Sequence, residues 1–238
     1  MSVTFTGSDK IGEVVARFPG ASNIFKEYSI DFCCGGNRSL SLALKQQNIN
    51  EEELLAKLNQ AYDKVVDMFS SSRDWREASS AELIDHIVNT HHAYLNQELP
   101  LLSEFVTKIL RVHGPAHEEL AQLHRLFHNL KMELDQHLIK EETILFPLIR
   151  EYEQNPSEEV RAKAAAQLDE IESEHTGAGD ILREMRAITN DYQLPEGACR
   201  TYTLTFQKLV ELESDLFQHI HLENNILFLR VAAPACGC

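Results

Sequence analysis

Hydrophobic positions recur at spacings of three and four along most of the chain, which is the period of an amphipathic α-helix. Four long segments carry this period in the last two thirds of the sequence, at about 80–112, 115–152, 156–189 and 195–232. A proline stands at or near the start of the last three, where its missing N–H is tolerated. Short connections predict antiparallel neighbours, so we expect an all-α fold whose main part is an up-down-up-down four-helix bundle.

The first 70 residues are divided into shorter helical segments, predicted at 8–18, 21–27, 39–46 and 50–69. Asn50 is suited to cap the last of them. Between the second and third segments the chain reads Asp-Phe-Cys-Cys-Gly-Gly, a turn that carries adjacent thiols at Cys33 and Cys34. The polar stretch 70–74 is typical of a linker. We therefore predict a small helical domain at 1–72, the bundle at 78–233 and a short tail with two cysteines at 234–238.

An internal repeat is the most informative feature of the bundle. Ten residues beginning at His137 align with ten beginning at His219, and each copy ends in Ile-Leu-Phe. A glutamate follows each histidine by four positions, at Glu141 and Glu223. Residues four apart lie one above the other on a helix, so each His–Glu pair can share a site.

These polar side chains occupy the hydrophobic face of their helices. The two predicted stripes are Leu130, Leu134, His137, Glu141, Ile144 and Leu148, and Leu212, Leu216, His219, Glu223 and Ile226. Burying ionised carboxylates without compensation is very costly, and a metal supplies the opposite charge. We therefore predict a metal site inside the bundle.

The other two helices each add a histidine. In the third, His175 follows Leu168 and Ile171 on one face. In the first, His91 and His92 are adjacent, and helical phase alone does not choose between them. Four imidazoles and two carboxylates suffice for a dinuclear centre with bridging carboxylates and an oxo or hydroxo group. Because no cysteine lies on these stripes, soft metals and iron–sulfur clusters are disfavoured, and iron is the preferred metal.

Composition limits the partners. With 22 basic and 37 acidic residues the formal net charge is −15, which disfavours nucleic acids and anionic membrane surfaces. No stretch approaches the roughly 18 apolar residues of a spanning helix. The first ten residues lack the pattern of a signal peptide, and the five cysteines are an odd number, so we expect a cytoplasmic protein.

The turn at 31–36, the repeats at 137–146 and 219–228, and Ser173-Glu174-His175 resemble the repair of iron centres (RIC) family, of the YtfE/ScdA type. The resemblance spans nearly the whole chain. It implies a small ScdA-type amino-terminal domain with paired cysteines and a haemerythrin-like bundle that holds two non-haem iron ions. The implied function is repair of iron–sulfur clusters damaged by oxidative or nitrosative stress, by iron donation to the damaged proteins.

The resemblance selects His92 over His91 as the first ligand. The implied ligand set is His92, His137, Glu141, His175, His219 and Glu223, with both glutamates as bridging candidates. Cys33 and Cys34 are expected to be exposed thiols that transfer iron or electrons. Glu133 and Glu174 are candidates to orient a ligand, with a solvated carboxylate equally favoured for each. His221, about 200° around its helix from His219, is expected at the surface.

Two other functions stay open. One is reduction of nitric oxide, or a peroxidase activity, at the di-iron centre, and the other is a haemerythrin-like carrier or sensor of oxygen or nitric oxide. A carrier would need the bundle but not the paired cysteines. The sequence does not decide whether the chain forms a homodimer.

Overall fold

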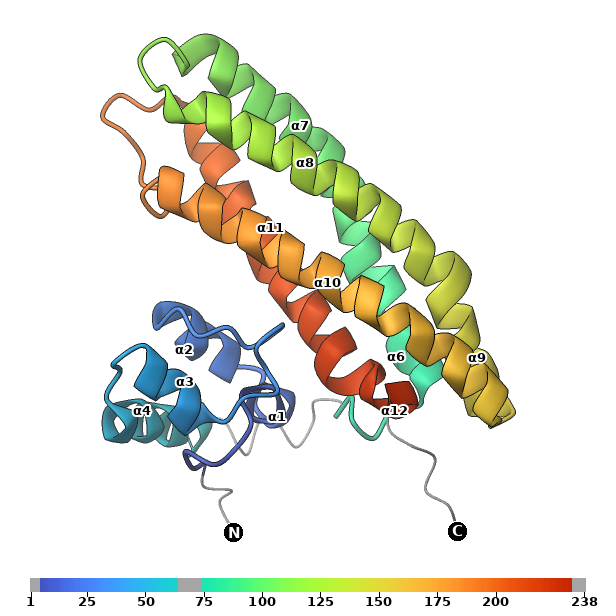
Figure 1. The fold of residues 1–238 in the computed structure, drawn as a ribbon. Coiled ribbons are helices and arrows are strands. Elements are labelled where there is room, and N and C mark those ends of the chain that lie inside the picture. Colours follow the sequence, from blue (N-terminus) through green and yellow to red (C-terminus); the bar gives the residue numbers. More distant parts are fainter. Residues whose placement is uncertain (1–4, 64–73, 233–238) are drawn as a thin grey trace. The chain divides into compact units, whose positions relative to one another are not determined.

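A computed structural model describes residues 5–63 and 74–232 (Figure 1). Within these residues there is no β-strand, only an isolated antiparallel bridge between Lys10 and Ser39. The all-α prediction is confirmed. The chain divides into two compact units, one made of Met1–Leu83 with Gln218–Cys238 and the other of Ile84–Phe217. The predicted tail at 234–238 and most of the predicted linker lie outside the described residues.

The amino-terminal part consists of short helices. They are α1 (Ile11–Arg17), α2 (Ala21–Glu27), α3 (Leu40–Gln46) and α4 (Glu51–Asp63). Asn50 caps α4 as expected, since its Oδ1 accepts a hydrogen bond of 3.2 Å from the backbone N–H of Glu53. The buried core of these helices includes Ile11, Val15, Phe25, Leu40, Leu44, Leu54 and Leu58.

Four long helical rods follow. The first is α6 (Ser80–Ile87), turn η1 (Val88–His92) and α7 (Ala93–His113), and the second is α8 (Glu119–Lys140), turn η2 (Glu141–Leu145) and α9 (Phe146–Gln154). The third is α10 (Glu158–Ile188), and the fourth is α11 (Arg200–Leu222), turn η3 (Glu223–Leu227) and α12 (Leu229–Ala232). Among the described residues, no helix is both long and apolar enough to cross a membrane.

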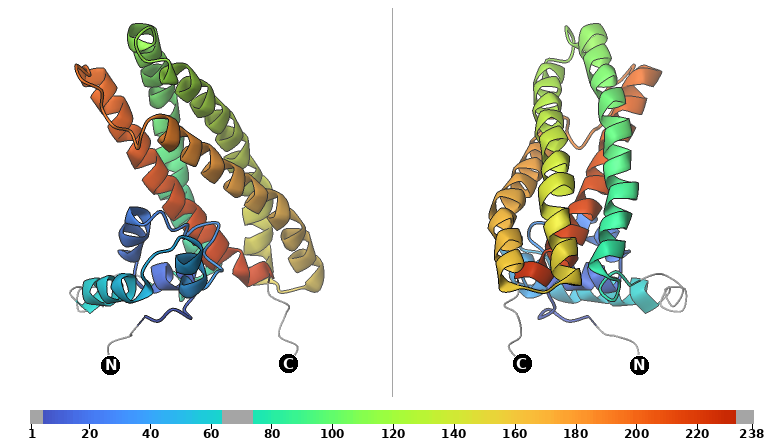
Figure 2. Two further views of the ribbon diagram at one scale, coloured as in Figure 1. Left: turned by 60° about the vertical axis from the view of Figure 1, so that its left-hand side comes forward. Right: turned by 90° about the vertical axis from the view of Figure 1, so that its right-hand side faces the viewer.

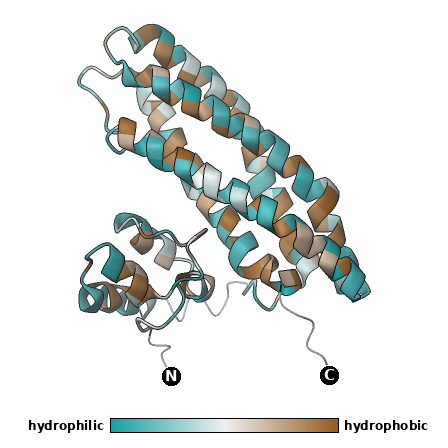
Figure 3. Ribbon diagram, in the orientation of Figure 1, coloured by the Kyte–Doolittle hydropathy of each residue, from teal (hydrophilic) through white to brown (hydrophobic). Residues whose placement is uncertain are grey.

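Figures 1 and 2 show α7, α8, α10 and α11 side by side, each antiparallel to the next along the chain, which confirms the predicted bundle. Helix α8 packs against both α7 and α10. In Figure 3, hydrophobic and hydrophilic positions alternate around each rod, as the period of the sequence requires. Leucines such as Leu99, Leu123, Leu130, Leu182 and Leu209 are at most 1% exposed and fill the core.

The prolines affect the helices less than the sequence suggests. A proline inside a helix removes one backbone hydrogen bond, so the sequence predicts a kink or a local break at Pro100 and at Pro147. Helix α7 nevertheless continues through Pro100 without a break. Pro147 lies in the first turn of α9, where its missing N–H is tolerated.

Three rods contain a π-helical turn, in which the N–H of residue i+5 binds the carbonyl of residue i. The N–H groups of Ala93, Phe146 and Phe228 donate to the carbonyls of Val88, Glu141 and Glu223. Each such turn inserts one residue into the helix and rotates the residues after it about the helix axis. The predicted stripe is therefore wrong at Ile144, which is 45% exposed, while its neighbour Leu145 is 1% exposed.

Candidate metal centre

Every π-helical turn begins or ends at one of the residues singled out from the sequence. His92 ends η1, Glu141 begins η2 and Glu223 begins η3. The extra residue in η1 decides which of the two adjacent histidines faces the centre. In a π-helical turn, residues five apart lie on the same face, and His92 lies five positions after the buried Ile87. His92 thereby comes to lie within 3.4 Å of Glu141, whereas the Nδ1 of His91 lies 2.9 Å from Asp215 Oδ1.

All six candidate side chains are buried, with exposed fractions of 3% or less. Glu141 is contacted by three imidazoles: the Nε2 atoms of His92, His137 and His175 lie 3.4, 3.4 and 3.9 Å from its carboxylate oxygens. The Nε2 atoms of His137 and His175 are 3.0 Å apart. Both rings therefore direct a nitrogen at nearly the same point, as ligands of one cation do.

The second copy of the repeat has the same internal geometry. His219 Nε2 lies 2.9 Å from Glu223 Oε1, one helical turn along the same rod. Both side chains are completely buried. The spacing that the sequence predicts to bring a histidine and a glutamate together therefore does so here.

The donor atoms form two overlapping sets, each able to hold a metal ion. One set is His92, Glu141, His219 and Glu223, and the other is His137, Glu141, His175 and Glu223. Within each set all donor atoms lie within 4.8 Å of one another. Both glutamates belong to both sets, while each histidine belongs to one. This composition fits two cations with nitrogen and oxygen ligands and is consistent with a di-iron site.

Comparison with known proteins agrees with this geometry. The hemerythrin HHE cation binding domain matches residues 83–231, and a domain of unknown function, DUF542 (ScdA_N), matches residues 7–62. The iron-sulfur cluster repair protein YtfE of Pectobacterium atrosepticum is 38% identical over 223 residues, which cover 92% of this chain and 95% of that protein. The YtfE proteins of Citrobacter koseri and Escherichia coli O157:H7 are 34% and 35% identical, covering 94% of this chain and 96% of theirs.

This chain belongs to the family of iron-sulfur cluster repair proteins. The resemblance seen in the sequence is thereby confirmed, as is the haemerythrin-like nature of the bundle.

In this family member two acidic residues hold the outer nitrogens of candidate ligands. The Nδ1 atoms of His92 and His137 lie 2.8 Å from Glu142 Oε1 and Glu174 Oε2. A carboxylate in this position fixes the ring and leaves Nε2 as the metal-binding nitrogen. Burial raises the pKa of Glu174, but hydrogen bonds from Lys140 and His137 outweigh it and leave the pKa below its ordinary value.

Only one of these two acidic residues could be picked out from the sequence. The sequence indicated Glu174, which contacts His137, and Glu133, which lies at an exposed position. Glu142 was missed. The repeat gives no signal for it, because Asn224 stands at the matching position of the second copy.

The paired cysteines lie in a third group of donor atoms, formed by Asp31, Cys33 and Cys34. Cys33 Sγ lies 3.3 Å from Asp31 Oδ1 and 3.8 Å from Cys34 Sγ. The expected exposure is wrong for Cys33, which is 4% exposed, whereas Cys34 is half-buried. A hydrogen bond with Cys34, together with burial, raises the pKa of Cys33 well above its ordinary value.

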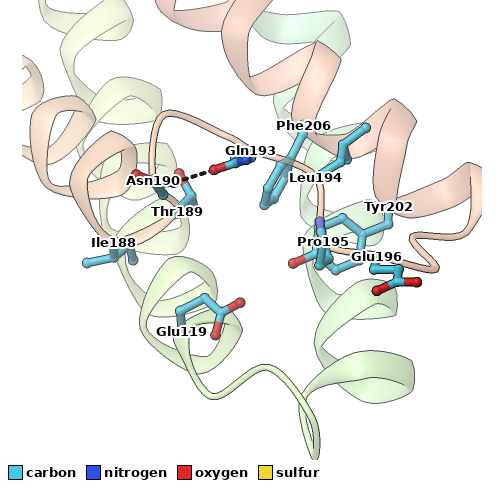
Figure 4. A pocket seen from close by; sticks show the side chains of 10 residues that line it. All are labelled: Glu119, Ile188, Thr189, Asn190, Gln193, Leu194, Pro195, Glu196, Tyr202 and Phe206. Atoms are coloured by element: carbon cyan, nitrogen blue, oxygen red, sulfur yellow. Dashed lines mark hydrogen bonds between the residues drawn. The ribbon is translucent and has the colours of Figure 1, made fainter.

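A separate cavity of about 360 Å³ lies at the connection between α10 and α11 (Figure 4). Its lining comes from the end of α10, the connecting loop and the start of α11, with Glu119 from α8. None of the candidate metal ligands lines it, so this cavity is not the metal centre.

Proposed function

We propose that this chain repairs iron–sulfur clusters damaged by oxidative or nitrosative stress, by holding two iron ions in its bundle and donating iron to the damaged protein. The observation that carries the proposal is the pair of donor sets that share Glu141 and Glu223. The relatives named as iron-sulfur cluster repair proteins support the same function.

We assign the ligands from these sets. His92 and His219 would bind one iron, His137 and His175 would bind the other, and Glu141 and Glu223 would bridge both. A carboxylate in this position would place negative charge beside two cations at once, which would offset the cost of burying it. Bound iron supplies redox chemistry and the metal that a damaged cluster has lost.

The donor types suit reversible binding. Nitrogen and oxygen ligands bind ferrous iron less tightly than they bind most later divalent metals of the same row, so iron held by such a site can be released. Glu142 and Glu174 keep the two imidazoles oriented, which preserves the site while iron leaves.

We further propose that Cys33 and Cys34, with Asp31, receive the iron that is transferred. Three donor atoms close together suit transient binding of iron as cargo. Because its pKa is raised, the Cys33 thiol stays protonated at neutral pH until a metal ion displaces the proton. Such a thiol binds metal only when metal is delivered to it.

The remaining partners follow from this function. We propose damaged iron–sulfur proteins as clients and nitric oxide or oxygen species as small ligands of the iron. Cys33 and Cys34 form no disulfide, which suits the reducing cytoplasm. All six candidate ligands come from one chain, so the site does not require a homodimer.

The test is anaerobic. Iron-loaded protein is mixed with a purified enzyme whose iron–sulfur cluster has been damaged with nitric oxide, and recovery of that enzyme is measured together with the iron that the donor loses. We expect recovery with the wild-type chain, little with Glu141→Gln or Glu223→Gln, and full recovery with Glu133→Gln as the exposed control. Production of nitrous oxide without recovery of the enzyme would instead favour a nitric oxide reductase.

A further inference from the structure

Asn225 joins the turn η3 to the thiol turn at 31–36, and both belong to the same compact unit. Its Nδ2 donates a hydrogen bond of 2.9 Å to the carbonyl of Cys33 and lies 3.5 Å from the carbonyl of Phe32. These contacts link residues more than 190 positions apart in the chain. They act directly on the backbone that carries the thiols.

Two glycines make room for this asparagine. A Cβ atom added to Gly12 or to Gly36 would lie 2.3 Å from Asn225 Oδ1, far inside contact distance. The backbone N–H of Gly12 also donates to the carbonyl of Gly36, at 2.8 Å. Gly12 lies within α1, where glycine is a poor helix former, and the close approach of Asn225 explains its presence.

His221 covers the same turn from the neighbouring part of α11. It is 1% exposed, which corrects the expectation of a surface position, and its ring packs edge-on against Phe32 with centroids 6.1 Å apart. Residues 219 and 223 of this rod belong to the candidate metal centre, whereas 221 and 225 contact the thiol turn. One short stretch of helix therefore carries two candidate metal ligands and also two residues that contact the thiol turn.

We propose that Asn225 is the positioning residue of the paired thiols: its amide fixes the Asp31–Gly36 turn on the π-helical turn that begins at Glu223. Cys33 and Cys34 are thereby held at a constant place beside the helical turn that carries a candidate iron ligand. This proposal deepens the proposed function and rests on it where iron transfer is concerned.

The first experiment measures alkylation of Cys33 and Cys34 by iodoacetamide in metal-free protein, with mass spectrometry to separate the two sites. The other cysteines are replaced by serine in every sample, at positions Cys199, Cys236 and Cys238. Asn225→Asp keeps the shape of the side chain but removes the N–H donor and sets a carboxylate against two carbonyls. Asn224→Asp adds the same charge one residue away and is the matched control.

We expect Asn225→Asp to speed alkylation of Cys33 on the order of tenfold, because one hydrogen bond is lost and a repulsion is gained. Asn224→Asp should alkylate at the rate of the parent protein. Equal rates for all three proteins would overturn the proposal.

A second experiment remains informative if Asn225→Asp folds poorly. Gly12→Ala should lower the Tm of the parent protein, and should lower it much less in an Asn225→Ala background, where the clashing amide is absent. Gly177→Ala, whose Cβ meets nothing within 4 Å, should not depend on residue 225. Additive effects of Gly12→Ala and Asn225→Ala would contradict the close packing.

The same variants separate this proposal from the proposed function. With iron bound, Asn225→Asp should keep the iron content of the parent but lose most of the cluster repair, since only the thiols are displaced. A chain that binds no iron, yet shows faster alkylation in Asn225→Asp, would refute iron donation and leave the positioning role standing. Normal repair by Asn225→Asp would show that the position of the thiols does not matter.

Discussion

At the scale of single residues, two carboxylates orient candidate ligands without belonging to the ligand set themselves. Glu142 and Glu174 accept hydrogen bonds from the Nδ1 atoms of His92 and His137. The Nε2 atoms of the same two rings face Glu141. A neutral imidazole can place its proton on either nitrogen, and the acceptor decides which. Loss of the negative charge on the acceptor weakens this hydrogen bond, so that the ring can rotate and expose the wrong nitrogen.

Glu142→Gln should therefore weaken iron binding by about 10- to 100-fold while leaving the fold intact. The measurement is competition for ferrous iron against a chelator of known affinity, under anaerobic conditions. Glu133→Gln, at an exposed position of α8, is the control and should bind iron like the parent. An unchanged affinity in Glu142→Gln would show that the hydrogen bond to His92 does not orient the ring.

At the scale of helices, a stacked pair of histidines on α8 contacts two hydroxyl groups on α7. His124 and His128 lie 4.1 Å apart between ring centroids, and their Nε2 atoms lie 3.1 Å from the hydroxyls of Thr107 and Ser103. Burial, and the neighbouring His128, lower the pKa of His124 below its ordinary value of 6.5. This contact is therefore sensitive to acid.

The direction of the pH dependence follows from proton binding. In the unfolded chain His124 takes up a proton as the pH falls through about 6.5, but in the folded chain it does so only at lower pH. The contribution of His124 to stability is therefore fully present above about pH 6.5 and declines as the pH falls below that value. It changes no further once His124 is also protonated in the folded chain. Chemical unfolding of metal-free protein at pH 7.5 and 5.0 should show a smaller loss for His124→Gln than for the parent. An identical loss in both would exclude His124 as a source of the decline.

The π-helical turns are the second feature at this scale. Turn η2 adds one residue between α8 and α9, so that Glu141 and Leu145 both face inward. Such single-residue insertions are tolerated in helices when they place a functional side chain. The turn should therefore matter for metal binding more than for folding.

Deletion of Thr143, an exposed residue of η2, should restore a regular α-helix with α8 and α9 still in phase. We expect the metal-free deletion variant to keep its helical circular dichroism and a Tm close to that of the parent. Its iron content after anaerobic loading should fall, because Glu141 loses its present direction. Two iron ions per chain in the deletion variant would show that the π-helical turn is not needed for the site.

At the scale of the whole molecule, burial requires that the carboxylates inside the bundle have a compensating positive charge, because an ionised group out of water is costly. Glu98 on α7 is 8% exposed and forms an ion pair with Lys208 on α11. Removal of one partner of a buried pair is more harmful than the pair is beneficial, because the remaining charge stays desolvated. Exposed pairs, such as Lys163 with Glu159, contribute little.

Lys208→Met should therefore lower the free energy of unfolding by about 3 kcal/mol, since it leaves Glu98 without its cation. Lys163→Met, which breaks a fully exposed pair, should change it far less. Urea unfolding of the two variants at neutral pH makes the comparison. Similar small losses for both would mean that Glu98 reaches water or another partner when Lys208 is absent.

The helices and the chemistry of the centre could be predicted from the amino-acid sequence. A period of three to four places His137 with Glu141, and His219 with Glu223, on buried faces wherever the helix is regular. Buried carboxylates of this kind demand a counter-charge, which is why a metal site could be predicted without any structure. The capping of α4 by Asn50 is equally local and was equally predictable.

Which side chains contact one another across the fold depends instead on how the folded chain packs. A π-helical turn shifts every residue after it by one position, so the helical period left His91 and His92 undecided and assigned Ile144 to the wrong face. Whether such a turn forms depends on how the helices pack, since its local cost is offset by contacts elsewhere in the chain. The contact of Asn225 with the thiol turn likewise joins segments more than 190 residues apart, and no local spacing encodes it.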